Sequence, residues 1–258
     1  MNNFKLISED QKLAFCSVAI SPIRSEKTDV SEISSQLLFG EPIEILEFGN
    51  PWIKIRSLLD GYEGFIDIKQ ALAFSNKELK TWLDNSTNQD LKFQTIQSPW
   101  GPVLISRGSL VGLSEQFQIG SFHFQQQSAP STPNNSIFHY ANEYLNTPYL
   151  WGGKSMFGID CSGFTQLVFR HFGFNLPRNA SQQIKCGSSI EFEQIASGDL
   201  AFFTNTDGKV IHVGIIGSNN EIIHASGRVR IDILKKNGIW NNDLSIQTHI
   251  LCDVKRIF

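Results

Sequence analysis

The sequence predicts a multidomain protein in which small all-β barrels precede an α+β domain. Its 258 residues exceed the roughly 100 to 200 that a single core usually spans. Short strand patterns broken by turn residues fill the first half, whereas helical periodicity followed by strands fills the second. Between the halves lies QQQSAPSTPNNS at 125–136, a polar stretch with two prolines that is typical of a linker. We therefore expect a domain boundary near residue 130.

The first predicted domain, residues 1–80, is all-β. Residues 14–74 consist of short apolar segments separated by turn-forming residues. Apolar and polar residues alternate in EPIEIL at 41–46 and in WIKIR at 52–56, as they do in a half-buried strand. Strands at this spacing predict a small barrel.

The second predicted domain, residues 81–128, is a degenerate barrel. NKELKTWLDN at 76–85 predicts a short helix that leads into it. Residues 93–124 are again strand-like, with Gly and Pro between the apolar segments. The sequence leaves the role of this domain open.

The third predicted domain, residues 129–258, is α+β. SIFHYANEYLN at 136–146 places its apolar residues at helical spacing, and Thr147 with Pro148 ends that helix. Helices that come before strands in this way indicate an α+β domain. The strand patterns are DLAFFTN (199–205), VIHVGIIG (210–217), EIIHASG (221–227) and ILCDVKRIF (250–258).

Composition excludes several classes of partner. Apolar residues make up 41% of the chain and charged residues 18%, as in a globular protein, and the net charge of -3 offers no basic surface. We therefore expect no nucleic-acid partner. No stretch approaches the roughly 18 apolar residues of a transmembrane helix, so we expect no membrane partner either.

The N-terminal segment contains LAFC at 13–16, which superficially has the form of a lipoprotein cleavage site. Glu9 and Asp10 stand where a basic region belongs, and the apolar run before Cys16 is short. We therefore expect no signal sequence and a cytoplasmic location. The four cysteines include no CxxC pair, which favours a reducing compartment over a disulfide scaffold or a zinc ribbon.

One cysteine lies in GIDCSGFTQLVFRHF at 158–172. Cys161 is followed by apolar residues at helical spacing, which places it in the first turn of a helix that begins near Asp160 or Cys161. Unpaired backbone N–H groups and the helix dipole stabilise a thiolate there and lower its pKa from about 8.5. The same N–H groups suit a developing oxyanion. Cys161 is thus a candidate nucleophile, and the other three cysteines are predicted to be small buried residues.

The candidate bases lie in VIHVGIIGSNNEIIHASG at 210–227, where His212 and His224 flank a Gly-Ser-Asn-Asn turn. A loop with an odd number of residues pairs His212 with Ser226 and puts both histidines on one face, whereas a two-residue loop puts them on opposite faces. In the first register His212 takes the thiol proton and His224 orients its ring, as in catalytic triads. Either histidine alone would be an ordinary sheet residue.

Five blocks of the second half follow one another over residues 148–227. They are PYLWGGKSMFGIDCSGFTQLVF (148–169), LPRNASQQ (176–183), SGDLAFF (197–203), HVGIIG (212–217) and IIHASG (222–227). Together they resemble the successive motifs of NlpC/P60 cysteine peptidases. The resemblance implies a papain-like α+β core with Cys161 as nucleophile, His212 as base and His224 as third catalytic residue, and no cofactor. It further implies cleavage of γ-D-glutamyl bonds in peptidoglycan peptides.

The first half carries a second resemblance. ISPIRSEKTDVSEISSQLLFGEPIEIL at 20–46 and WIKIRSLLDGYEGFID at 52–67 resemble the bacterial SH3 modules of the γ-D-glutamyl-L-diamino acid endopeptidase branch. Glu26 and Tyr62 match module positions that, together with Asp160, bind the free amine of an N-terminal L-Ala. The resemblance implies that the substrates are free murein tri- and tetrapeptides, from which L-Ala-D-Glu is released during cell-wall recycling.

Further substrate-binding residues follow from the same resemblance. Tyr149 and Trp151 match positions beside the catalytic thiol. Arg178 is expected to bind the D-Glu carboxylate, and Ser162 either donates a hydrogen bond to the same ligand or caps the helix. The family often has Asp after this arginine, whereas here the position is Asn179, a candidate binding residue that lacks the carboxylate. The diamino acid stays open between meso-diaminopimelate and lysine.

Two other functions stay open from the residues alone. Cys161, His212 and His224 are suitable zinc ligands, so one alternative is a zinc hydrolase with an open fourth position. The other is a non-catalytic wall-binding protein, in which the small barrels bind and the C-terminal domain is scaffold. We expect the protein to act as a monomer.

Overall fold

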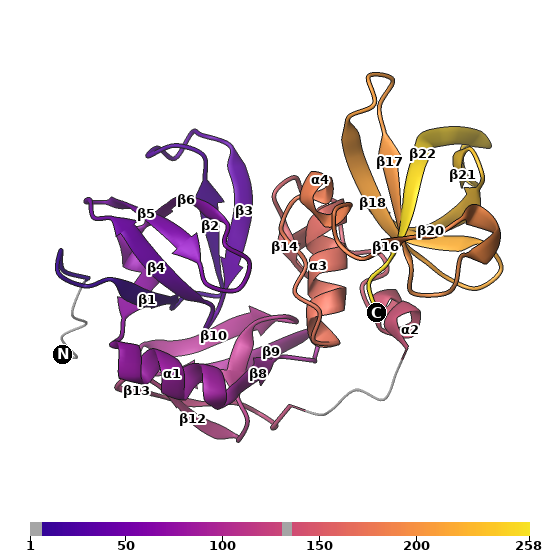
Figure 1. Cartoon of the computed structure of the whole chain (residues 1–258). Helices are drawn as coiled ribbons and strands as arrows, with labels where there is room; N and C mark the ends of the chain where they lie inside the picture. Colours follow the sequence, from indigo (N-terminus) through magenta and orange to yellow (C-terminus); the bar gives the residue numbers. More distant parts are fainter. Residues whose placement is uncertain (1–6, 131–135) are drawn as a thin grey trace. The chain divides into compact units, whose positions relative to one another are not determined.

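The computed structural model describes residues 7–130 and 136–258, so the centre of the predicted linker lies outside the described residues. Contacts divide the chain into two compact units (Figure 1). The first consists of Met1–Thr132 and Lys154–Met156, and the second of Pro133–Gly153 and Phe157–Phe258. Within the described part of the chain, no helix is both long and apolar enough to cross a membrane.

A seven-stranded antiparallel sheet with the order β3-β2-β6-β5-β4-β1-β7 opens the first unit. In β5, Ile53 and Ile55 are buried while Lys54 and Arg56 are only half-buried, which is the alternation that the sequence predicts. The predicted all-β, SH3-like region is confirmed. Its strands are β1 (Leu13–Cys16), β2 (Ile20–Arg24), β3 (Ile33–Leu38), β4 (Pro42–Glu47), β5 (Trp52–Ser57), β6 (Glu63–Asp67) and β7 (Ala71–Ala73).

A helix and two smaller sheets follow in the same unit. The helix, α1 (Asn76–Asp84), lies where the sequence predicts it, and a capping box between Ser75 and Glu78 fixes its start. Four strands form a sheet in the order β10-β9-β13-β12, and β11 pairs with β8. These strands are β8 (Ser86–Asn88), β9 (Phe93–Ser98), β10 (Gly101–Ser106), β11 (Leu110–Gly112), β12 (Gln116–Ile119) and β13 (Phe122–Gln125).

Strand β1 joins both parts of the first unit. Its Ala14 and Cys16 lie in the core of the barrel, whereas Phe15 between them lies in a second core together with Trp82. Because successive residues of a strand face opposite sides, one strand contributes to two cores. The region predicted as a second barrel therefore packs against the first barrel and shares strand β1 with it. The domain boundaries 1–80, 81–128 and 129–258 stay predictions.

The second unit is α+β, as predicted. Helix α3 packs against β18 of a sheet with the order β16-β22-β17-β18-β19-β20-β21, and β21 also pairs with β22, so that β17–β22 close on themselves. The helices are α2 (Ile137–Asn142), α3 (Cys161–His171) and α4 (Ala180–Gln183). The strands are β15 (Gly158–Ile159), β16 (Ser188–Ser189), β17 (Leu200–Thr204), β18 (Val210–Ile216), β19 (Glu221–Ser226), β20 (Arg228–Lys235), β21 (Gly238–Asn241) and β22 (Ile246–Arg256), while β14 (Lys154–Ser155) belongs to the first unit.

Helix α2 ends earlier than predicted. It stops at Asn142, and the N–H groups of Tyr144 and Leu145 then donate to carbonyls three residues back, which is the tighter pattern of a 3₁₀ turn. Asn146 follows with a φ of 68°, a left-handed conformation that ends a helix. The chain has therefore left the helix before Thr147 is reached.

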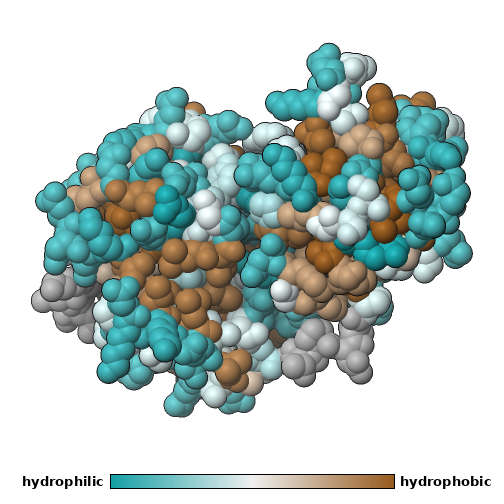
Figure 2. Space-filling model, viewed as in Figure 1, coloured by the Kyte–Doolittle hydropathy of each residue, from teal (hydrophilic) through white to brown (hydrophobic). Residues whose placement is uncertain are grey.

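Polar side chains cover much of the visible surface of both units, and apolar side chains gather in smaller patches (Figure 2). The prediction that Cys16, Cys186 and Cys252 are buried is correct for Cys16 and wrong for the other two. Cys252 is exposed because it lies on β22, along which only Val254 is buried. Cys186 is half-buried in the segment after α4.

Candidate active site

Cys161 is the first residue of α3, and Asp160 is the N-cap of that helix. The Asp160 carboxylate accepts a hydrogen bond from the Gly163 N–H at 2.7 Å, which satisfies one of the unpaired donors of the first turn. The Cys161 side chain is buried, and the backbone of Val213, the residue that follows His212 in β18, is near enough to the sulfur to oppose the rise in its pKa. The predicted helix start is confirmed, and it holds the thiol against the strand of the candidate base.

The resting Cys161 sulfur is protonated. Burial, followed by the nearby Asp160 carboxylate, raises the pKa of the thiol to about 12. The expectation that the helix N-terminus lowers this pKa is wrong for the resting site, because loss of water around a charged sulfur outweighs the N–H groups that stabilise it. Nucleophilic attack by Cys161 therefore requires a base that removes the proton as the bond forms.

His212 in β18 and His224 in β19 meet on one face of the sheet. Gly214 pairs with His224 and Ile216 with Ile222, so the loop between the strands has an odd number of residues and the favourable register is the one present. His212 Nε2 lies 2.8 Å from His224 Nδ1. Burial lowers the pKa of both rings below the ordinary 6.5, and both are neutral at pH 7.

Sequence reasoning missed two residues of this cluster. Asp232 Oδ2 lies 3.1 Å from His224 Nε2, and the His249 ring stacks on His212 with centroids 4.3 Å apart. Asp232 has a sequence signal, because it is the carboxylate of an alternating stretch, RVRIDILK at 228–235, directly after the second histidine strand. His249 has none, since it arrives on β22 from a distant part of the chain.

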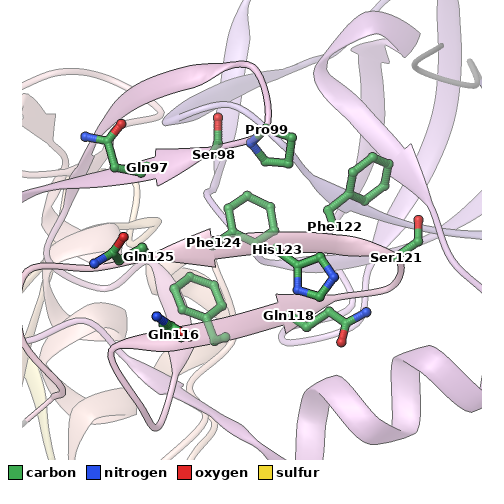
Figure 3. Close-up of a pocket in the computed structure, with 11 residues that line it drawn as sticks. Gln97, Ser98, Pro99, Gln116, Gln118, Ser121, Phe122, His123, Phe124 and Gln125 are labelled. Carbon is green, nitrogen blue, oxygen red and sulfur yellow. The ribbon is translucent and has the colours of Figure 1, made fainter. Parts of the chain in front are cut away.

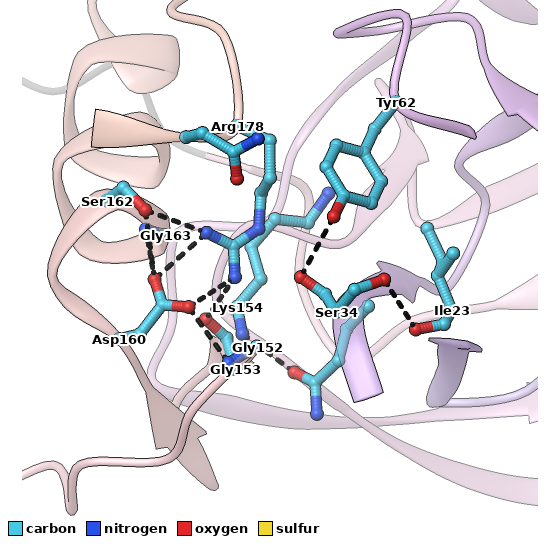
Figure 4. Close-up of polar contacts among 12 residues, drawn as sticks. Ile23, Ser34, Tyr62, Gly152, Gly153, Lys154, Asp160, Ser162, Gly163 and Arg178 are labelled. Carbon is cyan, nitrogen blue, oxygen red and sulfur yellow. Dashed lines mark hydrogen bonds and ion pairs between the residues drawn. The ribbon is translucent and has the colours of Figure 1, made fainter. Parts of the chain in front are cut away.

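Asp160 and Arg178 form a buried ion pair at the start of α3 (Figure 4). Arg178 Nη1 donates to Asp160 Oδ1 at 2.9 Å and Nη2 to Oδ2 at 2.6 Å. Ser162 Oγ accepts from Arg178 at 3.0 Å and donates to Asp160 at 3.3 Å, and the Gly152 N–H donates to Asp160 at 3.0 Å. The three side chains predicted to bind substrate are thus bonded to one another, and their ligand contacts stay predictions.

A family model described as the NlpC/P60 family matches residues 146–248, which contain Cys161, His212 and His224. The chain carries an NlpC/P60 cysteine peptidase domain. A second model, described as a bacterial dipeptidyl-peptidase SH3 domain, matches residues 23–70. The two resemblances seen in the sequence are therefore confirmed.

Two relatives align with about three quarters of the chain, so their similarity extends past the NlpC/P60 domain. A γ-D-glutamyl-L-lysine dipeptidyl-peptidase of Bacillus cereus is 25% identical over 77% of this chain and 68% of its own length. The protein of the same name from Bacillus subtilis is 27% identical, over 75% of this chain and 72% of its own. The crystal structure of an NlpC/P60 family protein from Bacillus cereus superposes with a TM-score of 0.78 at 17% identity, covering 95% of this chain and 99% of that one, which supports the fold.

Other predicted binding residues of the NlpC/P60 domain differ in exposure. Tyr149 is half-buried, and its pKa is raised to about 12 by burial, by the charge that Cys161 carries once it is ionised, and by the charge of Asp160, which places Tyr149 near the thiol. Trp151 is 63% exposed. Asn179 is exposed at the N-cap of α4, where its N–H donates to Gln182 at 3.4 Å.

Glu26 and Tyr62 belong to the first unit, whereas Asp160 belongs to the second. Glu26 is exposed in the turn between β2 and β3. Tyr62 is half-buried, and its hydroxyl donates to the Ser34 carbonyl at 3.4 Å (Figure 4). The amine site predicted for Glu26, Tyr62 and Asp160 stays a prediction.

The zinc alternative conflicts with the hydrogen bonds of His224. Its Nδ1 is bonded to His212 and its Nε2 to Asp232, so neither nitrogen is directed at a metal shared with Cys161. Over 7–130 and 136–258, no group of three or more His, Cys, Asp or Glu side chains has the arrangement of a metal site. The geometry favours thiol chemistry.

A hollow of about 960 Å³ lies elsewhere, on the first unit, over β9, β12 and β13 (Figure 3). Gln116 and Gln97 each pair with Gln125, so amide side chains cross three strands in one row, with His123 beside them. The hollow has no cysteine and lies outside the NlpC/P60 match. It is not the site of the thiol chemistry.

Proposed function

We propose that the protein is a cysteine peptidase that cleaves the bond between γ-D-Glu and the diamino acid of free murein peptides. One observation carries this proposal: a buried thiol at the start of a helix that packs against the strand of His212 lies near the Val213 backbone, and His212 is bonded to His224. The NlpC/P60 match and the names of the Bacillus relatives supply the class of substrate.

In this mechanism His212 takes the Cys161 proton as the sulfur attacks the γ-carbonyl carbon of D-Glu. Backbone N–H groups in the first turn of α3 stabilise the oxyanion that forms. His212 then gives its proton to the leaving amine of the diamino acid. Water attacks the thioester, with His212 again as base, and L-Ala-D-Glu leaves.

Recognition of a free L-Ala amine by Glu26, Tyr62 and Asp160 would restrict the enzyme to peptides with an unblocked N-terminus. Such peptides are those already released from glycan, which fits a role in cell-wall recycling in the cytoplasm. The SH3 domain match over residues 23–70 supports this assignment, because it covers both Glu26 and Tyr62.

The test is mass analysis of the products from L-Ala-γ-D-Glu-meso-diaminopimelate, its lysine counterpart and an N-acetylated copy of each. We expect L-Ala-D-Glu from the free peptides, no cleavage of the acetylated ones, and activity that survives a strong chelator. Equal cleavage of acetylated and free peptides would remove the amine site from the proposal. Absence of cleavage of all four peptides would overturn the proposal itself and favour the wall-binding alternative.

A further inference from the structure

Three titratable side chains form a line across three neighbouring strands. His212 Nε2 lies 2.8 Å from His224 Nδ1, and His224 Nε2 lies 3.1 Å from Asp232 Oδ2. All three are buried, with 6%, 1% and 1% of their surface exposed. Asp232 reaches His224 diagonally, because the strand register sets Arg230 opposite His224 and Asp232 two residues further on.

The Asp232 carboxylate is held by donors on its other side. Arg230 Nη2 donates to Oδ1 at 2.9 Å, the Asn242 N–H donates to Oδ1 at 3.3 Å, and Asn241 Nδ2 donates to Oδ2 at 3.4 Å. Burial by itself raises the pKa of Asp232, but the bonds from His224, Arg230 and Asn242 bring it below its ordinary 3.8. Asp232 is therefore an ionised group that can only accept hydrogen bonds.

An acceptor at this end fixes the proton positions along the line. His224 must donate from Nε2 to the carboxylate, and since the ring is neutral, its Nδ1 has no proton and accepts. His212 must then donate from Nε2, which leaves the Nδ1 of this neutral ring with a free lone pair. A nitrogen with a free lone pair is what a general base requires.

We infer that Asp232 is a positioning residue that sets the tautomer of His212 through His224, so that His212 Nδ1 is bare and accepts the Cys161 proton. The inference rests on the proposed function in one respect, namely that the proton accepted by His212 comes from the Cys161 thiol. During attack the S–H bond breaks as the S–C bond forms, and the proton moves to Nδ1. The His212 imidazolium keeps the hydrogen bond from its Nε2–H to His224, which is itself bonded to the charged Asp232. The proton on His212 Nδ1 later moves to the leaving amine.

Asp232→Asn tests the assignment with little change in shape. Arg230 Nη2 and the Asn242 N–H form hydrogen bonds to the Oδ1 position, whereas Arg230 Nε lies 2.8 Å from Oδ2 without the geometry of a hydrogen bond, so the amide oxygen takes the Oδ1 position and the NH₂ group faces His224. His224 Nε2 then accepts, its Nδ1 donates, and His212 carries its proton on Nδ1. We expect kcat to fall about 10³-fold or more with KM nearly unchanged, as when a triad carboxylate is replaced by its amide.

Asp243→Asn is the matched control. Asp243 is an exposed carboxylate 2.9 Å from the same Arg230, but it has no bond to His224 in the described structure. We expect its kcat to stay within about twofold of wild type, since surface ion pairs contribute little. A kcat for Asp232→Asn equal to that of the control would overturn the inference.

Nitrogen NMR of the imidazole rings gives a readout that needs no substrate. In the wild-type protein at neutral pH we expect the His212 signals of a protonated Nε2 and a bare Nδ1, and in Asp232→Asn the reverse. A wild-type protein with a protonated Nδ1 contradicts the inference even if Asp232→Asn fails to fold. An inactive wild-type protein with a bare Nδ1 counts against the proposed function and for the tautomer.

Discussion

Arg178 donates hydrogen bonds to both carboxylate oxygens of Asp160, at 2.9 and 2.6 Å. Asp160 is the residue directly before the candidate nucleophile, Cys161. Both side chains are buried, and each charge compensates the other for the hydration that it has lost. The same carboxylate accepts from the Gly163 N–H at 2.7 Å and thereby fixes the first turn of α3. A charge pair outside the His212–His224 line thus supports the position of Cys161.

Replacing Arg178 should destabilise the protein strongly. Arg178→Met leaves the Asp160 charge buried without its partner, for which we expect a loss of about 3–5 kcal/mol in the free energy of unfolding. Urea denaturation at pH 7 measures it. Arg228→Met is the control, because its ion pair with Asp243 spans 3.9 Å between side chains that are 52% and 61% exposed, and it should change little. Equal losses in both variants would contradict the buried-pair argument.

Alkylation should distinguish Cys161 from the exposed Cys252. The Cys161 thiol is buried and its pKa is raised to about 12, so iodoacetamide should label Cys252 first in the resting protein. Peptide mapping over time measures both modifications. We expect loss of peptidase activity to follow the labelling of Cys161, Cys161→Ala to be inactive, and Cys252→Ala to keep wild-type activity. Inactivation that follows Cys252 instead would refute the choice of nucleophile.

Acid should destabilise the NlpC/P60 domain before its carboxylates titrate. Burial lowers the pKa of His212, His224 and His249 from 6.5, and that of His249 to about 4. Between the unfolded pKa of 6.5 and the lowered pKa of the folded protein, each histidine binds more protons in the unfolded chain than in the folded one. Its contribution to the free energy of unfolding is therefore complete above pH 6.5 and is lost as the pH falls. The slope is at most about 1.4 kcal/mol per pH unit for each histidine.

Urea denaturation at pH 7, 6 and 5 measures this slope. His249→Gln removes one of the three histidines while the bonds of His212 to His224 and of His224 to Asp232 are kept. We expect a shallower loss of stability with acid in this variant. A slope identical to that of wild type would show that His249 does not titrate between its folded and unfolded pKa values.

The first unit contains a buried ion pair of its own. Lys154 Nζ lies 3.0 Å from Glu41 Oε2, and the two side chains are 1% and 0% exposed. Lys154→Met should cost about 3–5 kcal/mol by leaving Glu41 uncompensated, whereas adding Glu41→Leu should recover most of that loss. Thermal unfolding of wild type, single and double variants measures it. A double variant as unstable as the single one would show that charge burial is not the cause.

Local sequence patterns predict the elements of the site well. The start of α3 follows from an Asp before an apolar helical stripe, since an N-cap and a helix face are properties of one short segment. For the β18–β19 hairpin, the sequence left two strand registers open, one with both histidines on the same face and one with them on opposite faces. The loop between Ile216 and Ile222 selects one of them, and this choice depends on the conformation of the turn.

The sequence by itself determined the two domain types, the helix position of Cys161 and the candidate bases His212 and His224, because each is written in a contiguous motif. Only the tertiary structure decided that Asp232 stands behind His224, that His249 covers His212, and that the resting thiol has a raised pKa. The physical reason is that hydrogen-bond partners and loss of water are set by strands and helices that meet from distant parts of the chain.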